Sequence, residues 1–167
     1  EGTMVYITNS TLDQISVIST TTNTVVETVG VGENPRGIAI SPDGSTLYVA
    51  TYDSDNVSVI YALTNTVIGT IAVGDKPSGM ALTPDGNTLY LTNYGDNSVS
   101  VINTMDNSIL ATIPVGNNPT AVAITPDGSS CYVTNSGGTT VTEISTTSNT
   151  IVNEIATGTG PINMAIM

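Results

Sequence analysis

The chain has 167 residues, enough for one domain with its own core, and it contains no Phe, Trp or His and a single Cys. This composition excludes a disulfide framework, haem ligation by His and His-based zinc sites. The net charge of −12 arises from 14 acidic residues against only Arg36 and Lys76, and no apolar run approaches the length of a membrane span. Such a charge repels phosphate backbones and anionic lipids, so we expect no nucleic-acid partner and no direct membrane insertion.

The first predicted strands are two apolar segments, residues 5–9 and 15–18, and both recur at an interval of 42 residues. The segment Val-Tyr-Ile-Thr-Asn returns in related form at residues 47–51, 89–93 and 131–135. The segment Ile-Ser-Val-Ile returns at residues 57–60, 99–102 and 141–144. The same point of each repeat is marked by a proline, at Pro35, Pro77, Pro119 and Pro161. A fixed period of this length predicts a repeat architecture.

The second repeat shows the order of elements within one unit. Residues 38–40 predict a strand, Ser-Pro-Asp-Gly at residues 41–44 predicts a tight turn, and residues 47–51 predict the next strand. A polar loop at residues 52–56 precedes a strand at residues 57–60, and Thr64-Asn65 separates that strand from the last one at residues 66–73. Apolar residues do not follow helical spacing anywhere. Each repeat therefore predicts four strands and no helix.

The predicted fold is all-β, because a four-stranded sheet with two apolar faces must pack between copies of itself. We expect a single β-propeller domain over residues 1–167, with four blades of four antiparallel strands. A linear β-solenoid is the alternative. Three blades are predicted at about residues 35–76, 77–118 and 119–160.

The remaining blade is predicted to combine the two ends of the chain, residues 1–34 and 161–167. The C-terminal segment matches the first strand of a repeat, and pairing it with the N-terminal sheet would remove two unpaired strand edges. The ring closes either within one chain, as a four-bladed monomer, or between two chains, as an eight-bladed homodimer. The sequence leaves both open, and we favour the two-chain ring.

These repeats resemble the YVTN β-propeller repeat of prokaryotic surface-layer and other cell-surface proteins. Residues 132–135 read Tyr-Val-Thr-Asn, and the Pro-Asp-Gly turn and the other strand motifs follow in the same order, except that the first unit lacks its turn. The resemblance covers essentially the whole chain. It implies a non-catalytic structural or binding scaffold without cofactors at the cell surface, which presents loops to protein or glycan partners.

An acidic composition rich in Thr, Ser and Asn agrees with an extracellular location, and we expect any signal peptide to have been removed. Two alternatives to the scaffold remain. One is a lactonase-like hydrolase, since propellers related to this family include such enzymes. The other is an engineered or truncated fragment without a function of its own. With no His and one Arg, we expect no enzymatic activity and no catalytic site.

The loops that join successive repeats and the loops after each second strand share one face of a propeller, so their side chains are the candidate interaction residues. These are Asp13, Glu33, Arg36, Tyr52, Asp53, Asp55, Asp75, Lys76, Tyr94, Asp96 and Asn97. Asp53 and Asp55 are weak calcium candidates, because no complete calcium-binding loop motif is present, and we favour a solvated acidic rim over any metal site. Asn9, in Asn-Ser-Thr, is a candidate glycosylation site.

Two further residues depart from the repeat pattern. Glu143 stands where the other repeats have Val, in a strand expected to be buried, where an unpaired charge would have a raised pKa. We interpret it as tolerated at an edge or in a less buried blade. Cys131 replaces a Leu and is expected to be a buried apolar side chain. In the Pro-Asp-Gly turns, Asp43, Asp85 and Asp127 are expected to stabilise their own turns.

Overall fold

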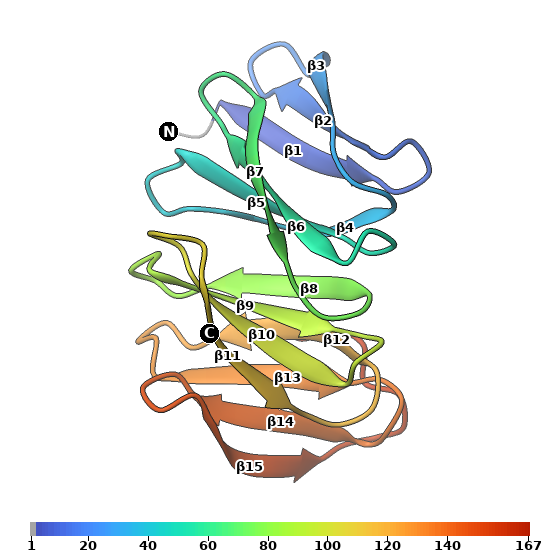
Figure 1. Ribbon diagram of the computed structural model, residues 1–167, viewed down its shortest axis with the longest axis vertical. Helices are drawn as coiled ribbons and strands as arrows, with labels where there is room; N and C mark the ends of the chain where they lie inside the picture. The colour runs from blue at the N-terminus through green and yellow to red at the C-terminus, as the bar shows by residue number, and fades with distance from the viewer. Residues whose placement is uncertain (1–2) are drawn as a thin grey trace.

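The computed structural model describes residues 3–167, which form fifteen strands in four antiparallel sheets (Figure 1). Blade 1 contains β1 (Met4–Asn9), β2 (Gln14–Ser19) and β3 (Thr24–Gly30). Blade 2 contains β4 (Pro35–Ile40), β5 (Thr46–Thr51), β6 (Asn56–Tyr61) and β7 (Thr66–Ala72). Blade 3 contains β8 (Pro77–Leu82), β9 (Thr88–Asn93), β10 (Ser98–Asn103) and β11 (Ile109–Pro114). Blade 4 contains β12 (Pro119–Ile124), β13 (Ser130–Asn135), β14 (Thr140–Ser145) and β15 (Thr150–Ala156).

The turns between strands use residues that tolerate positive φ. Gly44 closes the first Pro-Asp-Gly turn with φ 73°, and its amide donates to the Ser41 carbonyl. The hairpins between the two outer strands of each blade all contain an asparagine with φ between 50° and 59°, at Asn23, Asn65, Asn107 and Asn149. Each repeat therefore carries the turn chemistry that its strand order needs.

The core lies between the blades, in three apolar layers. Each blade has a forward face, toward the next blade in the sequence, and a backward face, toward the preceding one. Ile15 and Val17 on the forward face of blade 1 pack against Leu47, Val49 and Ile60 on the backward face of blade 2. The same positions recur in the other two layers. Alternating side chains thus give the middle strands of blades 2 and 3 two buried faces, as the repeat pattern predicted, whereas the middle strands of blades 1 and 4 have one.

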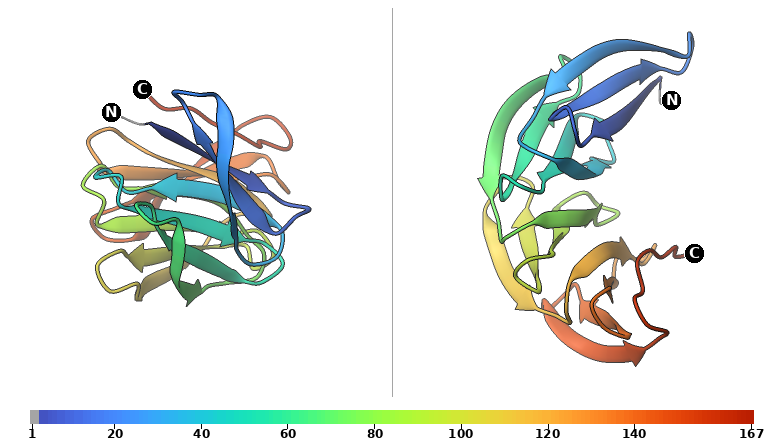
Figure 2. Two further views of the ribbon diagram at one scale, coloured as in Figure 1. Left: turned by 90° about the horizontal axis from the view of Figure 1, so that it is seen from above. Right: turned by 90° about the vertical axis from the view of Figure 1, so that its right-hand side faces the viewer.

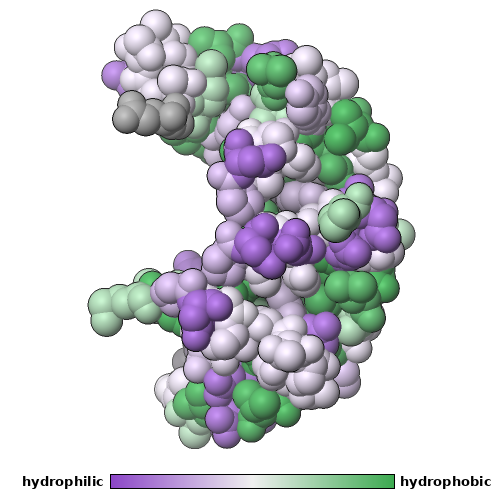
Figure 3. Space-filling model, turned by 90° about the vertical axis from the view of Figure 1, so that its left-hand side faces the viewer, coloured by the Kyte–Doolittle hydropathy of each residue, from purple (hydrophilic) through white to green (hydrophobic). Residues whose placement is uncertain are grey.

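The four blades follow a curved arc, with β4, β8 and β12 along its inner side and the outer strands along its convex side (Figure 2). Figure 3 shows the hollowed concave side, where hydrophilic residues gather. The predicted all-β propeller of four blades is confirmed, and the curvature distinguishes it from a straight solenoid. Within residues 3–167, no helix has the length and hydropathy needed to cross a membrane.

Closure within one chain, which the sequence left open as the alternative to a two-chain ring, is not what residues 3–167 show. Blade 1 has three strands, and residues 161–167 lie at the other end of the arc, beside blade 4 rather than beside β1 (Figure 2). The physical reason is that each blade packs only against its sequence neighbours, and the rotation at three such interfaces leaves the arc open. The rotation depends on how the side chains of two sheets interdigitate, which the repeat spacing does not specify.

Candidate functional site

The loops predicted to share one face do lie together, and hydrogen bonds link the loops of neighbouring blades there. Asp13 Oδ1 accepts from the Asn34 amide at 2.9 Å, and Asp55 Oδ1 accepts from the Lys76 amide at 2.9 Å. Asn97 Oδ1 accepts from the Asn118 amide at 2.8 Å. All of these residues have positive φ. At this repeat position the side chain is therefore a structural cap for the loop that leads into the next blade.

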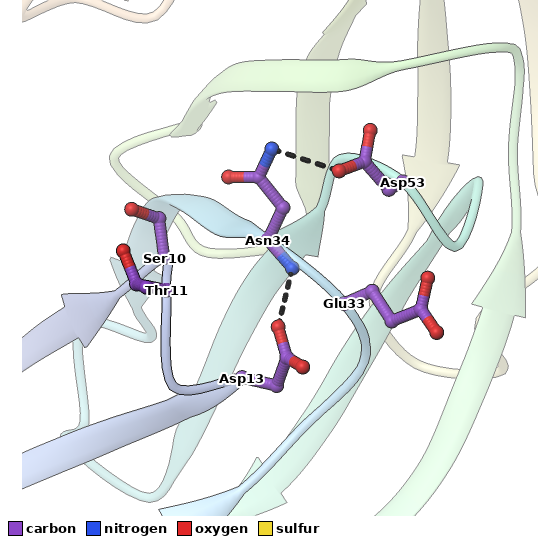
Figure 4. Close-up of a pocket in the computed structure, with 6 residues that line it drawn as sticks. All are labelled: Ser10, Thr11, Asp13, Glu33, Asn34 and Asp53. Atoms are coloured by element: carbon purple, nitrogen blue, oxygen red, sulfur yellow. Dashed lines mark hydrogen bonds between the residues drawn. The ribbon is translucent and has the colours of Figure 1, made fainter.

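A shallow pocket of about 440 Å³ opens on this face between the loops of blades 1 and 2 (Figure 4). Asn34 stands at its centre, and its Nδ2 donates to Asp53 Oδ2 at 3.0 Å while its amide donates to Asp13. The lining is entirely polar and holds three carboxylates over six residues: Ser10, Thr11, Asp13, Glu33, Asn34 and Asp53.

The three carboxylates of the pocket differ in their hydrogen bonds. Those of Asp13 and Asp53 are both occupied by Asn34. The Glu33 amide donates to Ser54 Oγ at 2.8 Å, but within residues 3–167 no group donates a hydrogen bond to the Glu33 carboxylate, which is exposed. Asp13 and Asp53 each engage one carboxylate oxygen, so Glu33 is the carboxylate of this pocket with both oxygens free.

Arg36 lies at the start of β4 and stacks on a tyrosine from the loop after β5. Its Cζ lies 3.4 Å from the ring centroid of Tyr52, a cation–π contact, and the Tyr52 and Tyr94 rings are 6.0 Å apart. The equivalent positions to Arg36 carry Ser78, Thr120 and Ile162. The arrangement is therefore specific to blade 2, and it places a guanidinium on the same face as the acidic loops.

Further candidates on this face have different surroundings. Asp96 Oδ2 accepts from the Asp75 amide at 2.7 Å, which again links two blades. Asp53 and Asp55, the calcium candidates, bond to different loops, since Asp53 accepts from Asn34 and Asp55 accepts from Lys76. No group of three or more His, Cys, Asp or Glu side chains within residues 3–167 is arranged to hold a metal ion.

Asn9, the glycosylation candidate, is engaged in its own blade. Its Nδ2 donates to Ser16 Oγ at 2.8 Å, on the backward face of blade 1. At the same repeat position Asn93 and Asn135 are fully buried and make two such bonds each. The Asn9 side chain thus repeats a structural contact between two strands.

Glu143 is half-buried on the forward face of blade 4, which no other blade covers. Hydrogen bonds from Asn153 and Tyr132, and a further one from Ser130, lower its pKa below the ordinary value for a glutamate. The interpretation as a less buried blade is confirmed. The raised pKa expected of a fully buried, unpaired carboxylate at this position does not apply, since three donors and partial solvation favour the charged form.

The sequence did not single out Ser10, Thr11 and Asn34, which complete the pocket. A signal for Asn34 exists, because the residue before the repeat proline is Asn34, Lys76, Asn118 or Gly160, and all four have positive φ. Ser10 and Thr11 carry no comparable signal, since their role comes from the approach of a loop more than 20 residues later in the chain.

Comparison with known proteins gives one family-model match, to "Lactonase, 7-bladed beta-propeller", over residues 1–67. That segment contains the whole pocket of Figure 4 and both Arg36 and Tyr52. A search of curated proteins finds no match.

Among solved structures, Kuenenia stuttgartiensis hydrazine synthase superposes with a TM-score of 0.89 and 30% sequence identity, over 94% of this chain and 47% of that chain. A functionally unknown protein from Desulfotomaculum acetoxidans superposes with a TM-score of 0.74 and 22% identity, over 90% of this chain and 50% of that chain. The second likeness shows the fold alone. The chain spans about half the length of both.

These matches correct the expectation that the chain is not an enzyme. The lactonase model and the hydrazine synthase structure point to a β-propeller family related to enzymes, with partial coverage in each case. The prediction was wrong because it weighed the missing His and the single Arg of this chain, whereas the family model matches residues 1–67 and the hydrazine synthase structure superposes over 94% of the chain. The comparisons favour the lactonase-like alternative over a surface-layer scaffold.

Proposed function

We propose that this chain forms part of a lactonase-like hydrolase propeller of the YVTN-repeat type, with its substrate site on the acidic face of blades 1 and 2. The observation that carries the proposal is the coincidence of the lactonase match, residues 1–67, with the pocket of Figure 4 and the Arg36–Tyr52 contact. The substrate class is a neutral cyclic ester.

Hydrolysis of a lactone needs a base for the attacking water and a positive group for the developing oxyanion. The Glu33 carboxylate is free of internal hydrogen bonds in the described chain and would take the proton of the water. The Arg36 guanidinium, held over the Tyr52 ring, would stabilise the negative oxygen formed on the carbonyl carbon. Cleavage of the ring C–O bond, with the proton passed from Glu33 to the departing alkoxide oxygen, then yields a hydroxy acid.

The charge of the face suits a neutral substrate and an anionic product. Asp13, Glu33 and Asp53 line the pocket, and the whole chain carries −12. A neutral lactone enters such a site without electrostatic penalty, whereas the carboxylate of the product is repelled. Product release is therefore favoured by the same residues that make the face acidic.

The test is acid release from a panel of aliphatic and sugar-derived lactones, followed with a pH indicator. We expect turnover by the wild-type protein and a loss of about 100-fold in Glu33→Gln, because a positioned general base contributes about that much. The matched control is Glu27→Gln, since Glu27 lies on the outer strand β3 and bonds to Asn65, away from the pocket. Absence of turnover across the panel, or equal loss in both variants, would contradict the proposal.

A further inference from the structure

The two ends of the arc carry the two halves of a blade interface, each without its partner. On the backward face of blade 1, Val5 and Ile7 are 45% and 43% exposed, whereas the equivalent Leu47 and Val49 are 1% and 0% exposed. On the forward face of blade 4, Ile155 is 40% exposed, whereas the equivalent Ile113 is 6% exposed. Each internal interface packs a forward face against a backward face, so these two exposed faces could pack against each other in the same way.

Glycines mark the same missing contact. A Cβ on Gly74 would lie 2.7 Å from the Asn93 side chain of the next blade, and a Cβ on Gly116 would lie 2.6 Å from Asn135. The next glycine in this series is Gly158, and a Cβ there would meet nothing within 4 Å. The residues that these glycines cover occupy one position of the repeat. In blade 1 that position is Asn9, which lies at the opposite end of the arc from Gly158.

Residues 161–167 already occupy the place of the inner strand of a fifth blade. The Thr134 hydroxyl donates to the Ile162 carbonyl at 3.1 Å, as Thr92 does to the Thr120 carbonyl at 3.4 Å and Thr8 to the Arg36 carbonyl at 3.0 Å. The segment pairs with no strand among residues 3–167. In the part of the chain that the structure describes, the sheet of blade 1 consists of the second, third and fourth strands of a blade, without the inner one.

We propose that two copies of this chain join head to tail, with residues 161–167 of each copy completing blade 1 of the other and closing a ring of eight blades. The register follows from blade 2, where Ile38 pairs with Val49, Ala39 with Tyr48 and Ile40 with Leu47. Met164 of one copy then pairs with Ile7 of the other, Ala165 with Tyr6, and Ile166 with Val5. This inference does not depend on the proposed hydrolase activity.

A second copy is the occupant because it supplies both missing faces at once. Its blade 1 brings the backward face that blade 4 lacks, and its residues 161–167 bring the strand that blade 1 lacks. A head-to-tail interface between identical chains closes when the two arcs together complete the turn.

Glu143 weakens this interface relative to those inside the chain. It occupies the position of Val17, Val59 and Val101, which are 0 to 2% exposed. At two of the internal interfaces the tyrosine hydroxyl donates to the next blade, Tyr6 to the Ala62 carbonyl and Tyr90 to Asn149 Oδ1. Tyr132 instead donates to Glu143 of its own blade at 3.0 Å. Covering the Glu143 carboxylate costs free energy, so Glu143→Val should lower the dissociation constant about tenfold.

The first measurement is the mass in solution by light scattering, over a range of protein concentrations. We expect a species of twice 17.1 kDa that dissociates on dilution. Gly158→Val should raise the dissociation constant about tenfold or more, because the new side chain would meet Asn9 of the second copy. Gly69→Val is the matched control, since a Cβ there also meets nothing within 4 Å but lies on the outer strand β7.

The second measurement fixes the register and decides between one chain and two. The pair Val5→Cys and Ile166→Cys should form a disulfide between copies on oxidation, seen as a covalent dimer that reductant reverses. The pair Val5→Cys and Ala165→Cys is the control, because adjacent strand residues point to opposite faces. A 17.1 kDa species at every concentration, an open-ended series of larger species, or a disulfide within one chain would overturn the proposal.

Discussion

Asp127 closes its turn with its own carboxylate. It accepts hydrogen bonds from the Thr125 hydroxyl and from the amide and hydroxyl of Ser129. These bonds favour the charged form and lower the pKa of Asp127 to about 2, and the pKa values of Asp43 and Asp85 are lowered in the same way. The structural role expected for these aspartates follows from bonds within five residues of chain.

Because the pKa of Asp127 is lower in the folded state than its ordinary value of 3.8, its contribution to stability is present above that value and lost as the pH falls toward 2. We expect the carboxyl carbon of Asp127 to titrate in NMR near pH 2 in the folded protein and near its ordinary value in urea. The same midpoint in both states would contradict the turn geometry.

Cys131 illustrates burial without reactivity. Its side chain is 0% exposed between blades 3 and 4, and burial raises the pKa of its thiol. We expect a thiol reagent such as iodoacetamide to modify Cys131 only as fast as the protein unfolds, and rapidly in denaturant. Rapid modification of the folded protein at neutral pH would show that the site is open.

At the scale of the strands, asparagines join the second and third strand of a blade on its backward face. Asn93 Nδ2 donates to Ser98 Oγ and to Ser100 Oγ, both at 2.9 Å, and all three side chains are buried. Asn135 makes the same pair of bonds to Thr140 and Thr142. The final residue of the strand motif thus holds two strands together.

Asn93→Ala should lower the free energy of unfolding by about 2 to 3 kcal/mol, since it removes two bonds and leaves two buried hydroxyls without their donor. Urea denaturation monitored by circular dichroism measures it. Asn117→Ala is the control, because Asn117 lies exposed in the loop before β12. An equal, small effect in both variants would mean that the pair of bonds contributes little.

The strands themselves were predictable, because their signals are local. Residues 57–60 were expected as a strand and lie within β6, and the Pro-Asp-Gly turn was found where its sequence places it. The Arg36–Tyr52 stack was not predictable as a contact, although both residues were candidates. It depends on where the loop after β5 meets the start of β4. The sequence signal was that the other repeats have no charged residue at the position of Arg36.

At the scale of the whole molecule, blade number and blade structure followed from the period, whereas the open arc did not. The rotation between blades arises from packing in layers such as that of Ile15 and Val17 against Leu47. Similar apolar residues would pack at a range of rotations. One sequence signal did indicate the uncovered face of blade 4. Glu143 places a charge where the other three repeats have Val.

The charge of the molecule predicts its response to salt. With −12 spread over the surface, self-repulsion opposes both folding and the approach of a second copy. We expect the melting temperature to rise between about 0.01 M and about 0.15 M NaCl, as the Debye length falls from about 30 to about 8 Å. Thermal circular dichroism measures it, with glycerol at equal osmolality as the uncharged control. A melting temperature that falls with salt would contradict this account.

Each interface between blades is assembled from the same parts, including the glycine that packs over the last residue of the next blade's strand motif. A duplication or loss of 42 residues would therefore lengthen or shorten the arc by one unit and leave every remaining joint intact. Adding a repeat in this way creates only interfaces of the kind already present. Such a molecule can change its size in single genetic events, while a fold with one shared core would have to be repacked throughout.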